Sequence, residues 1–139
     1  MGTQRTEEII AFARDVRNKW GRNPLDIAKR MGIKVIYVDG DTPGAQIIKA
    51  EKYPTIISIV GCKNPKGRQV LCAHELGHAF LHDEGVNRFD GTYETIVNDI
   101  EYEANLFAVA FFFDDWQFNM PIANMSNYVL KRVLDYNVQ

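Results

Sequence analysis

Apolar residues recur at helical spacing in several stretches of this chain, and residues that start or stop helices bound most of these stretches. The first predicted helix covers residues 6–20, where Gly21 provides a stop. A shorter second helix is predicted over residues 24–31, because Asn23 can cap its first turn. The same spacing predicts further helices over residues 68–82, 93–113 and 126–136.

Between the second and third predicted helices, the pattern becomes typical of strands. Residues 33–38 are β-branched or aromatic at most positions, and an Asp-Gly turn signal follows them. Residues 46–48 and 55–60 are predicted to form further strands, with Pro54 separating them. Two polar, glycine-containing segments are predicted as loops, at residues 61–67 and 83–92.

Two helices, a small and mostly antiparallel sheet, and then three helices predict an α+β fold in one domain, residues 1–139. With 46% hydrophobic and 24% charged residues, the 139-residue chain has the balance of a globular domain with its own core. Its net charge of −2 and the lack of a basic helix face argue against direct nucleic-acid binding. No apolar run approaches the roughly 18 residues of a membrane span, so no membrane association is expected.

The chain has two cysteines, Cys62 and Cys72. Since the N-terminus lacks the apolar stretch of an export signal, this single possible pair is expected to be two thiols, which favours a cytoplasmic location. Cys72 is expected to be a small core residue, and the alternative is a redox or inhibitory-ligand role.

A short motif that carries metal chemistry, His74-Glu75-Leu76-Gly77-His78, lies in the third predicted helix. The spacing of four residues puts both histidines on one helix face, about one turn apart, so both imidazoles can reach one ion. Glu75 lies one residue further round, where it can reach a water beside the ion but not the ion itself. The motif therefore predicts one zinc ion, and no other cofactor, with Glu75 as catalytic base.

A catalytic zinc ion needs a third protein ligand, and the fourth predicted helix offers Glu101 and Glu103. These two residues lie about 200° apart on a helix, so only one can face the metal. Glu101 shares its face with Asn105, which can fix the tautomer of a ligand histidine. Glu103 shares its face with Phe107, whose side chain cannot hydrogen-bond to a ligand histidine. We therefore predict Glu101 as the third ligand, with Asn105 supporting the ligands.

His82 continues the series of histidines after His74 and His78. Three roles stay open for it: a metal ligand, a hydrogen-bond donor to the transition state, or a helix end favoured by the helix dipole. The oxyanion-stabilising residue is not identified by the pattern, and its candidates are His82, Tyr93 and Arg68.

The predicted strand at residues 55–60 is the candidate edge for an extended substrate, because one loop connects it to the metal helix. A peptide could add to such an edge by backbone hydrogen bonds. The alternative is that this strand is buried and has no free edge.

Taken together, two segments resemble the ImmA/IrrE family of metallopeptidases: AHELGHAFLH at residues 73–82 and IEYEANLFA at residues 100–108. The resemblance implies a zincin-like fold. Carried over by position, it makes His74, His78 and Glu101 the zinc ligands and Glu75 the catalytic base.

Members of that family are bacterial or phage proteins, and those encoded on mobile elements cut a repressor that bears a helix-turn-helix domain. The resemblance therefore implies a zinc-dependent endopeptidase whose substrate is such a repressor, and whose role is to induce a mobile element or prophage. The alternative is a zinc-containing regulator that binds a repressor, or a toxin–antitoxin or DNA-damage partner, without cutting it. Glu75 favours catalysis, because a closed structural zinc site has no use for a base.

Overall fold

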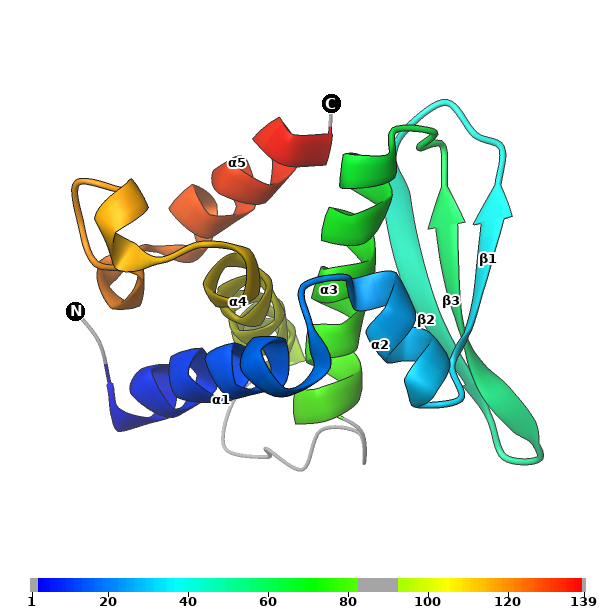
Figure 1. Ribbon diagram of the computed structural model, residues 1–139, viewed down its shortest axis with the longest axis horizontal. Coiled ribbons are helices and arrows are strands. Elements are labelled where there is room, and N and C mark those ends of the chain that lie inside the picture. The colour runs from blue at the N-terminus through cyan, green and yellow to red at the C-terminus, as the bar shows by residue number, and fades with distance from the viewer. Residues whose placement is uncertain (1–2, 83–92, 139) are drawn as a thin grey trace.

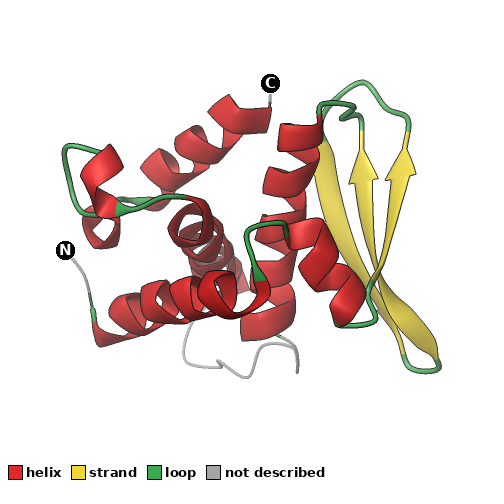
Figure 2. Ribbon diagram, viewed as in Figure 1, coloured by secondary structure: helices red, strands yellow, loops and turns green. Residues whose placement is uncertain are grey.

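The computed structural model describes the backbone of residues 3–82 and 93–138, and the side chains of residues 3–82 and 99–138. Its elements, in chain order, are α1 (Gln4–Trp20), α2 (Pro24–Arg30), β1 (Lys34–Val38), β2 (Gly44–Ala50), β3 (Tyr53–Val60), α3 (Pro65–Leu81), α4 (Tyr93–Phe112), the short 3-10 turns η1 (Asp115–Gln117) and η2 (Ile122–Asn124), and α5 (Asn127–Val138). Helices and strands are segregated along the chain as predicted (Figures 1 and 2), which confirms the α+β class. The predicted loop at residues 83–92 lies outside the described residues.

Local capping explains where the helices begin. The Asn23 side chain accepts a hydrogen bond from the Leu25 amide, 3.0 Å away, at the start of α2. At the start of α3, the Asn64 side chain accepts from the Lys66 amide at 2.9 Å, and Pro65 takes the first helical position. This cap starts α3 earlier than the apolar spacing predicted, and the loop before it is correspondingly shorter.

The sheet has the strand order β1-β3-β2, with β3 in the centre. Strand β3 pairs parallel with β1 and antiparallel with β2, so the sheet is mixed where a mostly antiparallel one was expected. The central strand is also the most buried of the three: Ile57 and Ile59 of β3 are almost completely buried. Because both edges of β3 are paired, the prediction that residues 55–60 form a free pairing edge is wrong.

The sequence pattern predicted that Pro54 separates two strands. In the structure, Pro54 lies inside β3. The residues that turn the chain between β2 and β3 are Glu51 and Lys52. Strand β1 pairs only with residues 56–60 of β3, so at Pro54 the strand has β2 as its sole neighbour among the described residues. A proline is tolerated there because it removes no hydrogen bond between β3 and β1.

Helix α3 is the central element of the molecule (Figure 1). One of its sides packs with α2 against a single face of the sheet, and helices α1, α4 and α5 gather on the other side. The buried apolar residues form one connected core, which extends from Ile57 under the sheet to Leu76 and Phe107 between the helices. Among the described residues, no helix combines the length and the apolarity needed to cross a membrane.

Gly77 sets how closely α3 approaches α4. A Cβ atom at this position would lie 3.1 Å from the Cα and 3.2 Å from the carbonyl oxygen of Ala104, and 3.3 Å from the Cβ of Phe107. Since two of these atoms belong to the backbone of α4, a larger residue at position 77 can be accommodated only if the helices move apart.

We predict that Gly77→Val destabilises the protein by about 1–3 kcal/mol, the usual cost of overpacking, despite the better helix propensity of valine. Urea unfolding followed by circular dichroism measures this loss. Gly44→Val is the matched control, because a Cβ atom there meets nothing within 4 Å. Equal stability of the two variants would show that the approach of α3 to α4 does not depend on Gly77.

Candidate metal centre

Three predicted ligand side chains come together where α3 meets α4. The Nε2 atom of His74 lies 3.1 Å from Oε1 of Glu101, and the Nε2 atom of His78 lies 3.1 Å from Oε2 of the same carboxylate. One ligand atom from each residue fits within a group whose atoms all lie within 4.8 Å of one another. These residues therefore form a group that could hold a metal ion.

Helix α3 presents the histidines to solvent because its other faces are buried. Val70, Ala73 and Leu76 pack into the core at helical spacing, whereas His74 and His78 stay partly exposed on the remaining face. The two imidazole rings lie edge to face, with their centroids 4.8 Å apart, as expected for residues one turn apart.

The electrostatics of the group favour an ionised Glu101. Hydrogen bonds with His74 and His78 lower the pKa of Glu101 far below its usual range, although partial burial opposes them. The pKa of His74 is raised: burial lowers it, but hydrogen bonds with Glu101 and Asn105 and the nearby Glu75 charge outweigh burial. Each group thus stabilises the charged form of its neighbour.

Glu75 has the opposite environment from Glu101. Its side chain is almost completely buried, and this burial raises its pKa above the usual value for a glutamate. The His74 and His78 side chains and a hydrogen bond from the Ile47 backbone lower the pKa in part. One carboxylate oxygen lies 3.9 Å from Nε2 of His74, so Glu75 is beside the group without belonging to it. A carboxylate with a raised pKa binds a proton more readily than an ordinary glutamate, which suits it to proton exchange beside such a group.

A cleft of about 550 Å³ opens over the group. The residues that line the cleft come from β2, from α3 and the residue that follows it, and from α4. They are Ala45, Gln46, Ile47, Lys49, His74, Glu75, His78, His82 and Glu101. The strand at the cleft is therefore β2, an edge strand of the sheet, and not the central β3 that the sequence had indicated. The tight turn pairs β2 with β3, and because β1 occupies the other edge of β3, β2 is the strand beside the histidines of α3.

Asn105 is buried in α4, one turn beyond Glu101. It forms a hydrogen bond with His74, and its Nδ2 atom donates to the Asn127 side chain at 2.8 Å. The second bond fixes the orientation of the amide, so the Asn105 oxygen is the atom left to accept from His74. This contact agrees with the support expected of Asn105.

His82 lies at the end of α3, and its ring contacts Glu103 and His78. Its Nε2 atom is 3.0 Å from Oε1 of Glu103, and its Nδ1 atom is 3.2 Å from Nδ1 of His78. Glu103 in turn accepts two hydrogen bonds from Arg5 of α1. The sequence pattern missed the roles of Glu103 and Arg5, because Arg5 is 98 residues from Glu103 and no local spacing links them.

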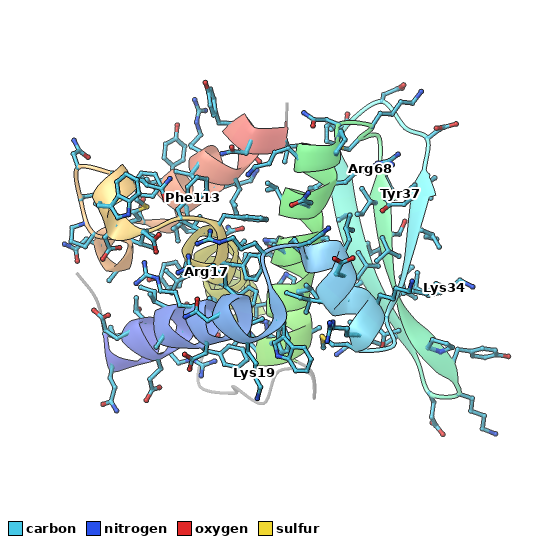
Figure 3. All side chains as sticks on the ribbon, in the orientation of Figure 1. Arg17, Lys19, Lys34, Tyr37, Arg68 and Phe113 are labelled. Atoms are coloured by element: carbon cyan, nitrogen blue, oxygen red, sulfur yellow. The ribbon has the colours of Figure 1, made fainter. Side chains whose placement is uncertain are left out.

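Arg68 does not lie at the cleft. Its Nε atom donates to the Cys62 carbonyl at 2.8 Å, and its guanidinium lies 3.9 Å from the centre of the Tyr37 ring, at the opposite end of α3 from His82 (Figure 3). The suggestion that Arg68 stabilises the oxyanion is therefore wrong. The side chain of Tyr93, a second candidate, lies outside the described residues. Lys49, which the sequence had not suggested, supplies the cleft with a cationic side chain.

Cys72 is completely buried in the core between α3 and its neighbours. Burial, together with the nearby charge of Glu75, raises the pKa of its thiol to about 12. The thiol is therefore protonated at neutral pH, and within the part of the chain that the structure describes, Cys72 does not belong to the group that could hold a metal. This environment agrees with a core residue.

The chain is similar in sequence to a family of peptidases. The sequence profile of the family Peptidase_M78, described as the IrrE N-terminal-like domain, matches residues 28–133, and the chain belongs to this ImmA/IrrE family. The chain is also 34% identical over 95 residues to the "Uncharacterized immunity region protein 2" of Bacillus phage phi105. That match covers 68% of this chain and 60% of the phage protein, so it spans less than two thirds of its relative. No solved structure is significantly similar to the chain.

We predict that Cys72 in the folded protein reacts with iodoacetamide at least about 100-fold more slowly than in urea, because reaction requires opening of the core. A Cys62→Ser variant leaves Cys72 as the only thiol, and mass spectrometry follows its modification. Equal rates in the folded and unfolded protein would show that Cys72 is accessible.

Proposed function

We propose that this chain is a zinc-dependent endopeptidase that cleaves a helix-turn-helix transcriptional repressor. The observation that carries the proposal is the convergence of His74, His78 and Glu101 beside Glu75 in an open cleft. Membership of the Peptidase_M78 family supports the peptidase class independently of this geometry.

The donor set fits a catalytic zinc ion. Two imidazole nitrogens and one carboxylate oxygen are the ligands of one common catalytic zinc type, which keeps a fourth position open. Ligand atoms around a tetrahedral zinc ion lie roughly 3.4 Å apart. The Glu101 oxygens lie 3.1 Å from the nearer nitrogen of each histidine, and the three ligand atoms lie within 4.8 Å of one another, which is close to that spacing. When bound there, zinc would polarise the scissile carbonyl and lower the pKa of the attacking water.

Glu75 is the proposed general base. Its carboxylate takes a proton from the water that attacks the scissile carbonyl carbon, and returns that proton to the leaving amine nitrogen when the C–N bond breaks. Burial supports this role because it raises the pKa of Glu75 toward the operating pH, where one group can both accept and release a proton.

Strand β2 is the proposed support for the substrate. The Ile47 backbone forms a hydrogen bond with Glu75, so at this residue the edge of the strand faces the cleft. An extended segment of a substrate can add to this edge by backbone hydrogen bonds, which would bring its peptide bonds past Glu75 and the histidines. Such pairing needs no particular side chains, so selectivity would come from the other contacts of the cleft.

The choice of a repressor as substrate rests on the relatives. The similar phage protein is named for an immunity region. The family resemblance described above implies a repressor as the substrate. The proposed partner is therefore a protein with a helix-turn-helix domain, and its cleavage would relieve repression and induce a mobile element or prophage. Because such a repressor acts on DNA inside the bacterial cell, the proposed location of the protease is the cytoplasm.

For the metal, we predict that wild-type protein binds one zinc ion and that Glu101→Ala binds zinc at least about 10-fold more weakly, because it lacks one of three ligands. Metal analysis after dialysis against defined free zinc measures the occupancy. Glu51→Ala, which removes an exposed carboxylate between β2 and β3, is the matched control and keeps wild-type occupancy. Undiminished occupancy in Glu101→Ala would remove Glu101 from the ligand set.

For catalysis, we predict that the zinc-loaded protein cuts the repressor encoded beside its gene, and that Glu75→Gln lowers the cleavage rate about 10²–10⁴-fold, as expected for loss of a general base. Gel electrophoresis and intact mass measure the cleavage. Zinc occupancy of Glu75→Gln is measured in parallel, and it stays at the wild-type level because Glu75 is not a proposed ligand.

The alternative function gives a different result in the same experiment. If the repressor stays intact with zinc-loaded wild-type protein but co-elutes with it, the protein is a binding regulator and the protease proposal is wrong. Cleavage at equal rates by wild type and Glu75→Gln would retain the protease and remove Glu75 from its mechanism.

A further inference from the structure

A chain of hydrogen bonds leads from α1 through α4 to His78. The Nε and Nη2 atoms of Arg5 donate to the two oxygens of Glu103, at 3.0 and 3.1 Å. Oε1 of Glu103 lies 3.0 Å from Nε2 of His82, and Nδ1 of His82 lies 3.2 Å from Nδ1 of His78. We call Arg5, Glu103 and His82 the support chain of His78.

The order of partners determines where the protons lie. The Glu103 carboxylate, paired with Arg5, only accepts, so the Nε2 atom of His82 carries the proton of their shared hydrogen bond. A neutral His82 then has its lone pair on Nδ1, which faces His78. The Nδ1 atom of His78 must therefore carry the proton of the bond between the two rings. Nε2 is then the nitrogen of His78 that shares a proton with Glu101 or, when a cation takes the place of that proton, binds the cation.

The Nε2 atom of His78 is the one that faces Glu101, 3.1 Å away, in the group that could hold a metal. The support chain thus selects the one neutral tautomer of His78 in which the nitrogen at the cleft can bind a cation. It also holds the ring plane, because the bond to His82 opposes rotation about the side-chain torsions of His78.

The inner part of the support chain is buried. The side chains of His82 and Glu103 are only 8% and 7% exposed, whereas that of Arg5 is 49% exposed. A buried carboxylate is costly unless it is paired, and Arg5 provides a bidentate partner from another helix. A hydrogen-bonded partner behind a metal-binding histidine typically changes metal affinity about 10–100-fold.

We propose that Arg5, Glu103 and His82 are positioning residues that fix the tautomer and orientation of His78 and thereby strengthen zinc binding. This inference rests on the proposed function, since it requires that His78 binds the metal. It assigns to His82 a role that differs from ligand, transition-state donor and helix end, and it extends the metal site to the N-terminal helix.

The first test substitutes His82 in two ways. His82→Phe keeps a ring but removes both hydrogen bonds, and we expect zinc affinity to fall about 10–100-fold. His82→Gln keeps an oxygen that can accept from His78 and an amide that can donate to Glu103, and we expect it to recover most of the lost affinity. Competition with a chromophoric zinc chelator measures the dissociation constants, and the visible spectrum of the Co²⁺-loaded protein reports the ligand geometry directly.

The second test compares two arginines of α1, one inside the support chain and one outside it. Arg5→Gln interrupts the support chain at its exposed end, and we expect a several-fold loss of zinc affinity. Arg14→Gln is the matched control, because Arg14 pairs with Asp115 at 3.5 Å, beyond the end of α4. The neighbouring Asp114 contacts both Arg14, at 3.9 Å, and Arg17, at 3.3 Å. We expect Arg14→Gln to keep wild-type affinity, and thermal unfolding of the metal-free variants shows whether both lose similar stability.

The outcomes separate this inference from the proposed function. Equal zinc affinity in wild type, His82→Phe and His82→Gln would overturn the inference while leaving the proposed function intact. An equal loss of zinc affinity in Arg5→Gln and Arg14→Gln would also overturn the inference, because the loss would then follow from the lower stability of the fold and not from the support chain. If His82→Phe does not fold, the pair of arginine variants still tests the inference, because Arg5 is half exposed. A wild-type protein that binds no zinc would overturn both the inference and the proposed function.

Discussion

The group of His74, His78 and Glu101, which could hold a metal ion, forms because α3 and α4 approach each other closely. Helix α3 carries His74 and His78, but Glu101 comes from α4, so the distance between the helices decides whether one group forms. Gly77 and Ala104 meet at that approach, and neither has a side chain large enough to separate the backbones. The same small residues that let the core pack therefore let Glu101 reach both histidines.

The two carboxylates at the cleft differ in environment, and this difference separates their chemistry. Glu101 is partly exposed and hydrogen-bonded to two imidazoles, so its pKa is lowered and it stays anionic. Glu75 is buried beside the sheet, so its pKa is raised and it can exchange a proton. Two glutamates with pKa values shifted in opposite directions are the pattern expected when one acts as a ligand and the other as a base.

Helix α4 contacts the histidines of α3 from two sides. Glu101 faces the cleft, whereas Glu103, two residues later, faces α1 and contacts His82. The opposite directions of these side chains follow from helix geometry, since residues two apart point about 200° apart. One turn of α4 thereby joins the cleft to α1, and Arg5 becomes part of the surroundings of His78 although it lies 98 positions before Glu103 in the chain.

The α+β class, the order of the elements and the pair of histidines on one helix face could all be predicted from the amino-acid sequence, because they follow from local periodicity, capping and spacing. The choice of Glu101 over Glu103 for the cleft used the helix repeat together with the neighbour on each face, Asn105 for Glu101 and Phe107 for Glu103. In contrast, two features emerged only from the folded chain. Strand β2, not β3, lies beside the cleft, and Glu103, which is paired with Arg5, contacts His82. Strand order and contacts between distant helices depend on how all the elements pack together, and no local pattern of residues specifies them.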